Sequence, residues 1–286
     1  MNPSLSSYFH RTLNNVSAFV KKNPFYTALL IHLTIITIYV GSTLLNGSGH
    51  PVFVDLTEGV NLSDASNRIY YTYADNWGEA VAEKQRIVPF TILWALYKVL
   101  PLGDDDFIPF RILAGYWFSI IGFILGLKLM YESEKDKSHK SLKLFLAVLL
   151  ATAVYIYNPW MTNRIIHNFL YFSTFTVPLS FGLAYKYFFG DSKKPWILLV
   201  LNGLLLGTFM TTPHTILLVG IALLGVLIIA LIRRKFSKIL LFIFTVIPIA
   251  IISGLYWILP FLLYRPSPDR VESLTIFQLL ARNTSL

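Results

Sequence analysis

The sequence contains no cysteine and few charged residues. Without cysteine the chain forms no disulfide, offers no thiolate nucleophile and supplies no cysteine ligand to a metal. Charged residues make up 14% of its 286 residues, whereas soluble domains carry about 25%. Hydrophobic residues reach 55%, so the chain would aggregate in water. This composition excludes a cytosolic enzyme, a disordered regulator and a fibrous protein, and it predicts an integral membrane protein.

The apolar residues are gathered in seven long segments. An apolar helix needs about 20 residues, with a range of about 17–25, to cross the hydrocarbon core of a membrane. The segments are Pro24–Leu45, Phe107–Met130, Leu142–Tyr157, Phe169–Phe188, Pro195–Thr211, His214–Ile232 and Ile239–Leu263. We therefore expect an all-α polytopic membrane protein with about seven transmembrane helices.

Basic residues near the ends of these segments predict the topology, because cytoplasmic loops carry an excess of lysine and arginine. The basic clusters lie at residues 21–22, 135–143, 193–194 and 233–238. All four fall on one side if an eighth apolar run, Ile87–Leu100, does not cross the membrane. We therefore interpret Ile87–Leu100 as an interfacial or re-entrant helix on the outer face. The chain is then a multi-pass protein of the plasma (cell) membrane with a cytoplasmic N-terminus and a long outer loop, residues 46–106.

The segments that flank the membrane domain, residues 24–263, differ in character. Residues 1–23 place apolar side chains at helical spacing beside basic residues, which predicts an amphipathic helix on the cytoplasmic surface. Residues 264–286 are expected to form an outer segment. The net charge of +9 reflects the orientation and an attraction to anionic inner-leaflet lipid. No nucleic-acid partner is therefore expected.

The outer loop carries most of the acidic residues, and a long loop among short connections is typical of a functional site. Asp55 and Glu58 are three residues apart and share a face if their segment is helical. A carboxylate at the membrane surface can serve as a general base, because partial burial raises the pKa of a carboxyl group. The alternative is that both acids are solvated or cap a short helix. The three acids Asp104–Asp106 are expected to cap the helix that begins at Phe107.

A second polar group, NPWMTNRIIHN (Asn158–Asn168), follows the third apolar segment. Arg164 and His167 lie on one face if this stretch is helical, and a guanidinium group is suited to the oxygens of a lipid phosphate. The alternative is a polar loop anchored at the interface by Trp160, with an arginine that reaches the headgroups. Arg111, one turn into the second segment, should face protein or water rather than lipid.

Aromatic and histidine residues complete the candidates. Trp77 and its neighbouring tyrosines can stack on a sugar ring, or they belong to an aromatic belt at the interface. The outer histidines His50, His167 and His214 have no spacing that demands a metal. We therefore expect no metal and no other cofactor, with a divalent metal as the less favoured alternative.

Two stretches resemble a known family of membrane enzymes. The run YIYNPWMTNRIIHNFLYFSTFTVPL (Tyr155–Leu179) and the tail PFLLYRPSPDRVESLTIFQLLARNTSL (Pro260–Leu286) look like segments of archaeal and actinobacterial transferases of the arabinofuranosyltransferase type. The order of one span, a long acidic outer loop with interfacial helices and further spans is similar to type C (GT-C) glycosyltransferases, whose shared core has seven spans. In such proteins the tail continues into further spans, so the resemblance is compatible with an N-terminal portion of a longer protein.

The resemblance implies an inverting transfer of a hexose or pentose on the outer face. The donor would be a polyprenyl-phosphate-linked sugar, and the acceptor a cell-envelope glycan, lipid or glycoprotein. The family's catalytic acid lies in the first outer loop, which implies that Asp55, with Glu58 nearby, takes the proton of the acceptor. Arg164, with Arg111 or His167, would stabilise the departing lipid phosphate. Trp77 and Trp160 would contact the substrates.

Two other functions remain open. The first is a non-catalytic GT-C-like membrane module or accessory subunit. The second is a transporter or flippase for lipid-linked sugars. Transporters often show internal repeats, and the sequence has none. Ionisable residues within the apolar segments are scarce, with His32 as the main case at mid-span.

Overall fold

The computed structural model describes residues 17–42, 87–100, 102–103, 106–134, 142–159, 161, 170–210 and 213–263. These residues form helices and no strand. The helices are α2 (Pro24–Ile36), η1 (Thr37–Gly41), α6 (Ile87–Lys98), α7 (Phe107–Tyr131), α8 (Leu142–Ile156), α10 (Leu170–Phe189), α11 (Pro195–Phe209), α12 (Pro213–Ile232) and α13 (Phe236–Leu263).

Each predicted apolar segment overlaps a helix within the described residues, and the helix ends follow local chemistry. Proline occupies the start of α2 and of α11, where its missing N–H group costs nothing. Within the first segment, α2 is continued directly by a short π-helix, η1. The turn between α12 and α13 places Arg234 in the left-handed region, with φ 54°. Of residues 1–23, predicted to be amphipathic, only 17–23 are described, and residues 17–22 are helical.

By length and composition, four helical stretches are apolar enough to cross a membrane. They are Pro24–Gly41, Phe110–Tyr131, Thr215–Ile232 and Phe236–Leu259. Two more helices, α8 and α11, are apolar but shorter. The remaining long helix, α10, has Pro178 in its interior and buries several serine and threonine side chains against its neighbours. These apolar helices identify the chain as a membrane protein.

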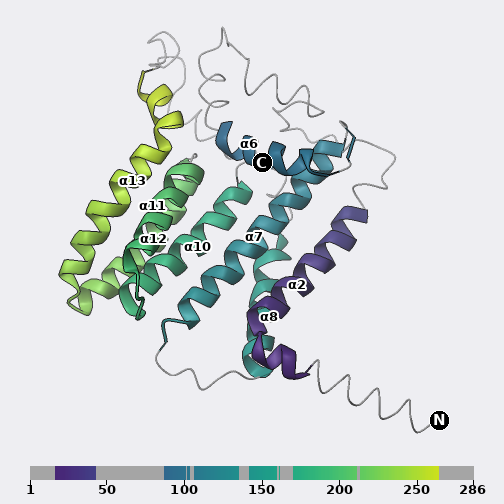
Figure 1. Cartoon of the computed structure of the whole chain (residues 1–286), viewed down its shortest axis with the longest axis horizontal. Coiled ribbons are helices and arrows are strands. Elements are labelled where there is room, and N and C mark those ends of the chain that lie inside the picture. The colour runs from purple at the N-terminus through teal and green to yellow at the C-terminus, as the bar shows by residue number, and fades with distance from the viewer. Residues whose placement is uncertain are drawn as a thin grey trace.

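The long helices lie beside one another, and α6 lies across the end at which α7 begins (Figure 1). One face of α6 is buried: Phe90, Leu93 and Tyr97 each have 4% or less of their surface exposed. Tyr97 contacts the rings of Phe107 and Phe110 of α7, with centroids 5.3 and 5.2 Å apart. Tyr97 therefore fills the junction between α6 and α7.

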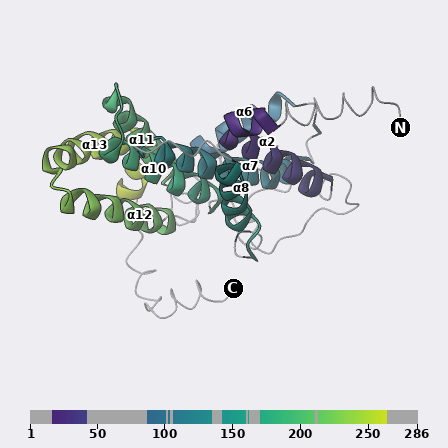
Figure 2. The ribbon, with the colours of Figure 1, turned by 90° about the horizontal axis from the view of Figure 1, so that it is seen from below.

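The buried side chains form two clusters. One unites α2, α6, α7 and α8 with Phe172 at the start of α10, and the other unites α10, α11, α12 and α13. Viewed from below, α12 and α13 lie at one end of the assembly and α2 with α8 at the other (Figure 2). The packing of α10 against α7 joins the two halves.

The outer faces of the helices are strongly apolar. Val154 of α8, Ile221 of α12 and Phe244 of α13 are 74%, 61% and 73% exposed. Exposed apolar patches of this extent are rare on monomeric soluble proteins. The faces are suited to contact with lipid chains.

Candidate functional site

Most of the residues that the sequence nominates for function lie outside the described residues. These are Asp55, Glu58, Trp77, Trp160, Arg164 and His167. Arg111 lies within the described part of the chain, near the start of α7. The site can therefore be built from Arg111 and the elements around it.

Arg111 is buried, with 3% of its surface exposed. Its neighbours Phe110 and Ile112 are also buried, and α6 lies across this end of α7 (Figure 1). An arginine in an apolar helix is costly unless it faces protein or water and its charge is matched. Arg111 takes part in an interaction within the protein. This buried cation lies one turn from the N-terminal end of α7, where the helix dipole is also positive.

The connection before α7 is tied down by side chains. Tyr97 donates its hydroxyl hydrogen to the carbonyl oxygen of Gly103. The backbone N–H of Gly103 donates to Oδ2 of Asp106 at 2.9 Å. Asp106 occupies the N-cap position of α7, but its side chain makes no capping hydrogen bond. The prediction that this side chain caps the helix is therefore wrong, because the carboxylate holds the preceding turn instead. Asp104 and Asp105 lie outside the described residues.

Small hydroxyl groups link four helices inside the assembly, and sequence reasoning missed them. The hydroxyls of Ser119 in α7 and Thr174 in α10 are 2.5 Å apart, and the hydroxyl of Tyr155 in α8 donates to the Thr174 carbonyl at 2.8 Å. Ser173 of α10 bonds to Thr215 of α12. The available signal was the recurrence of serine and threonine along α10. Such hydrogen bonds hold helices together in lipid. None of these side chains is a carboxylate, an imidazole or an amine that could transfer a proton near neutral pH.

His32, the ionisable residue at mid-span, links two helices through hydrogen bonds. Its side chain is 2% exposed, and its ring nitrogens lie 3.2 Å from the Tyr157 hydroxyl and 3.0 Å from the Leu149 carbonyl oxygen. Both ring nitrogens therefore have hydrogen-bond partners, one in α8 and one just after its end, and these bonds hold α2 against α8. Across the described residues, no group of three or more histidine and acidic side chains is close enough to hold a metal ion.

Comparison with models of known protein families, with curated proteins and with solved structures finds no match to this chain. Function is therefore inferred from the residues themselves.

Proposed function

We propose that the protein is a membrane glycosyltransferase of the type C kind. It would move a hexose or pentose from a polyprenyl-phosphate donor to a glycan, lipid or glycoprotein acceptor on the outer face of the cell membrane. The observation that carries the proposal is the buried Arg111 at the α6 end of α7. It supplies a desolvated positive charge where the long acidic loop joins the membrane domain.

The arrangement of the helices also supports the proposal. We propose that α2, α7, α8, α10, α11, α12 and α13 are the seven spans of the membrane domain, with α6 as an interfacial helix on the outer side. With this order, the loop of Asp55 and the segment of Arg164 would lie at the end of the molecule that holds Arg111. Carboxylate and guanidinium groups would then face the same region of the membrane surface.

The proposed transfer needs only the acceptor, the donor and these side chains of the protein. The acceptor hydroxyl oxygen forms a bond to the anomeric carbon while the bond between that carbon and the phosphate oxygen breaks. Asp55 takes the hydroxyl proton as general base. The bonding electrons leave with polyprenyl phosphate, and Arg164 and Arg111 stabilise its negative charge. The configuration at the anomeric carbon inverts because the attack is a single displacement.

The test uses the full chain in lipid nanodiscs. It is incubated with short-chain polyprenyl phosphates that carry radiolabelled mannose, glucose, galactose or arabinofuranose, together with a panel of oligosaccharide glycosides as acceptors. We expect release of polyprenyl phosphate coupled to a labelled glycoside, and we expect Asp55→Asn to abolish both products. General-base catalysis contributes about 10²–10⁴-fold to a rate, so a loss in that range is the result to expect.

Lys143→Gln serves as the matched control, because this exposed lysine at the start of α8 lies at the opposite end from Arg111. It should keep full activity. An Asp55→Asn variant that is folded and fully active would overturn the assignment and favour a non-catalytic membrane module. Movement of the donor across the bilayer of a proteoliposome, without sugar transfer, would favour a flippase.

A further inference from the structure

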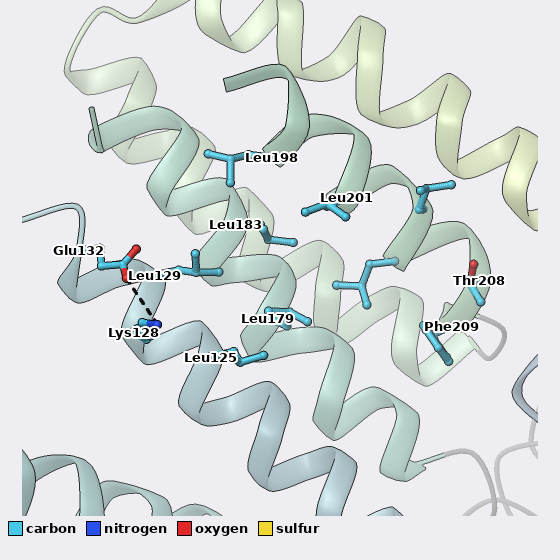
Figure 3. Close-up of a pocket in the computed structure, with 12 residues that line it drawn as sticks. Leu125, Lys128, Leu129, Glu132, Leu179, Leu183, Leu198, Leu201, Thr208 and Phe209 are labelled. Atoms are coloured by element: carbon cyan, nitrogen blue, oxygen red, sulfur yellow. Dashed lines mark ion pairs between the residues drawn. The ribbon is translucent and has the colours of Figure 1, made fainter. Parts of the chain in front are cut away.

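A groove of about 520 Å³ lies between α7, α10 and α11 (Figure 3). Helix α10 contacts both α7 and α11 and forms the floor with Leu179 and Leu183. The walls are leucines of α7 and α11, and the lining is almost wholly apolar. The lining residues are Leu125, Lys128, Leu129, Glu132, Leu179, Leu183, Leu198, Leu201, Leu204, Leu205, Thr208 and Phe209. A volume of this size suits one small ligand or one lipid chain.

The groove is long and narrow. Along α11 it extends from Leu198 to Phe209, which corresponds to about 16 Å at 1.5 Å per residue and to most of this helix. A partner helix about 10 Å across would not fit within its volume, whereas one extended acyl chain that enters at the end near Lys128 would fill it.

The charged end of the groove holds Lys128 and Glu132 (Figure 3). Lys128 is in the last turn of α7 and Lys186 is in the last turn of α10. Glu132 forms an ion pair with Lys186, so its negative charge is matched from the neighbouring helix. Its distance from Lys128 is 3.8 Å. The three side chains together carry one net positive charge.

Lys128 keeps capacity for an anion. The Nζ atom donates to the neutral hydroxyl of Tyr26 at 2.6 Å and lies 4.3 Å from the centre of the Tyr26 ring. An ammonium group has three donors, and 26% of the Lys128 side chain is exposed. The turn between α12 and α13 adds Arg233 and Lys235 beside the end of α10, where both lie over the Phe189 ring. Glu134 also lies here and accepts a hydrogen bond from Tyr185 of α10. The four basic side chains at this end still outnumber its two glutamates, Glu132 and Glu134.

We propose that this groove binds one anionic glycerophospholipid. Its acyl chain lies along α10 between α7 and α11, and its phosphate accepts a hydrogen bond from Lys128. A basic site between helices is a recognised means of selecting anionic headgroups on the cytoplasmic side, which is the side that the basic clusters predict for Lys128. The proposal is independent of the sugar-transfer function.

The test exploits the absence of cysteine from the sequence. A single cysteine at Leu201, in the groove, carries a fluorophore, and a second single-cysteine variant carries the same label at Leu217, on the exposed face of α12. The full chain is reconstituted in phosphatidylcholine vesicles that contain either brominated phosphatidylglycerol or brominated phosphatidylcholine as the quencher. We expect brominated phosphatidylglycerol to quench the label at position 201 at about fivefold lower mole fraction, which corresponds to about 1 kcal/mol for one cation near the surface. The label at position 217 should show no preference.

Three variants distinguish a specific lipid site from a general attraction of anionic lipid to the protein surface. Lys128→Gln should remove the preference at position 201, whereas Lys143→Gln on α8 should leave it unchanged. Leu179→Phe should fill the floor and lower quenching by both lipids. Equal quenching by the two lipids at position 201 would overturn the proposal, and so would an equal effect of Lys143→Gln and Lys128→Gln. Thermal unfolding in the same vesicles verifies that each variant is folded.

Discussion

Gly182 of α10 and Gly126 of α7 meet backbone to backbone. A Cβ atom added at Gly182 would lie 2.6 Å from the carbonyl oxygen of Gly126 and 2.7 Å from its Cα atom. Four residues earlier on α7, a Cβ atom at Gly122 would lie 2.5 Å from the Phe175 carbonyl oxygen. Lipid provides no hydrophobic force between helices, so close packing of small residues supplies much of the attraction. The contact joins the two halves of the membrane domain.

We expect Gly182→Ala to destabilise the protein by about 1–3 kcal/mol, because the added methyl group has only backbone to displace. Gly220→Ala is the matched control, since a Cβ atom there has no atom of the described residues within 4 Å. That change should be neutral or should stabilise α12 by up to about 1 kcal/mol. The measurement is thermal unfolding of both variants in detergent micelles. Equal melting temperatures for the two variants would show that α7 and α10 do not meet in this way.

A polar contact between α10 and α11 lies close to Gly182 in the sequence. The Ser180 hydroxyl donates to Oδ1 of Asn202 at 2.7 Å, and Nδ2 of Asn202 donates to the Ser180 carbonyl oxygen at 3.3 Å. Both side chains have no exposed surface. A double-mutant cycle of Ser180→Ala and Asn202→Ala should give a coupling of about 0.6 kcal/mol, the average for such bonds in membranes, and at most about 1.7 kcal/mol. Ser133→Ala is the control, because the Ser133 hydroxyl donates to the Leu129 carbonyl oxygen of α7, and its effect should be additive with that of Asn202→Ala.

The course of the helices was largely predictable, and their contacts were not. Apolar runs indicated the approximate extents of α7, α12 and α13, because hydrophobicity over about 20 residues is a strong signal. The same signal says nothing about which helices touch, so the contact of Gly126 with Gly182 and the bond of Ser180 with Asn202 depended on tertiary packing. The role of Asp106 was also predicted wrongly, since its carboxylate holds the preceding turn and does not cap α7. The acids and bases proposed for catalysis fall between the predicted apolar segments and lie outside the described residues, and no periodicity in the sequence specifies how their side chains are placed.

The predicted orientation of the membrane domain has a direct test. The cytoplasmic assignment of the α7–α8 connection predicts that a cysteine at Ser138 reacts with a membrane-impermeant maleimide only after the inner surface is exposed. A cysteine at Ser66, in the predicted outer loop, should react in intact cells. The cysteine-free background keeps both signals specific. Labelling of Ser138→Cys in intact cells would reverse the orientation and would place Lys128 on the outer side.

The role proposed for Arg164 separates donor binding from acceptor binding. If its guanidinium group holds the lipid phosphate, Arg164→Ala should raise the KM for the polyprenyl-phosphate donor and lower kcat, because a cation on a leaving group acts most strongly in the transition state. The KM for the acceptor should change little. Loss of one such interaction costs about 2.7–4 kcal/mol, or about 10²–10³-fold in kcat.

Arg164→Lys should recover part of the rate, since an ammonium group keeps the charge but loses the two-point geometry. Steady-state kinetics with each substrate varied in turn measures these effects. A change confined to the KM for the acceptor would place Arg164 at the acceptor instead of the phosphate.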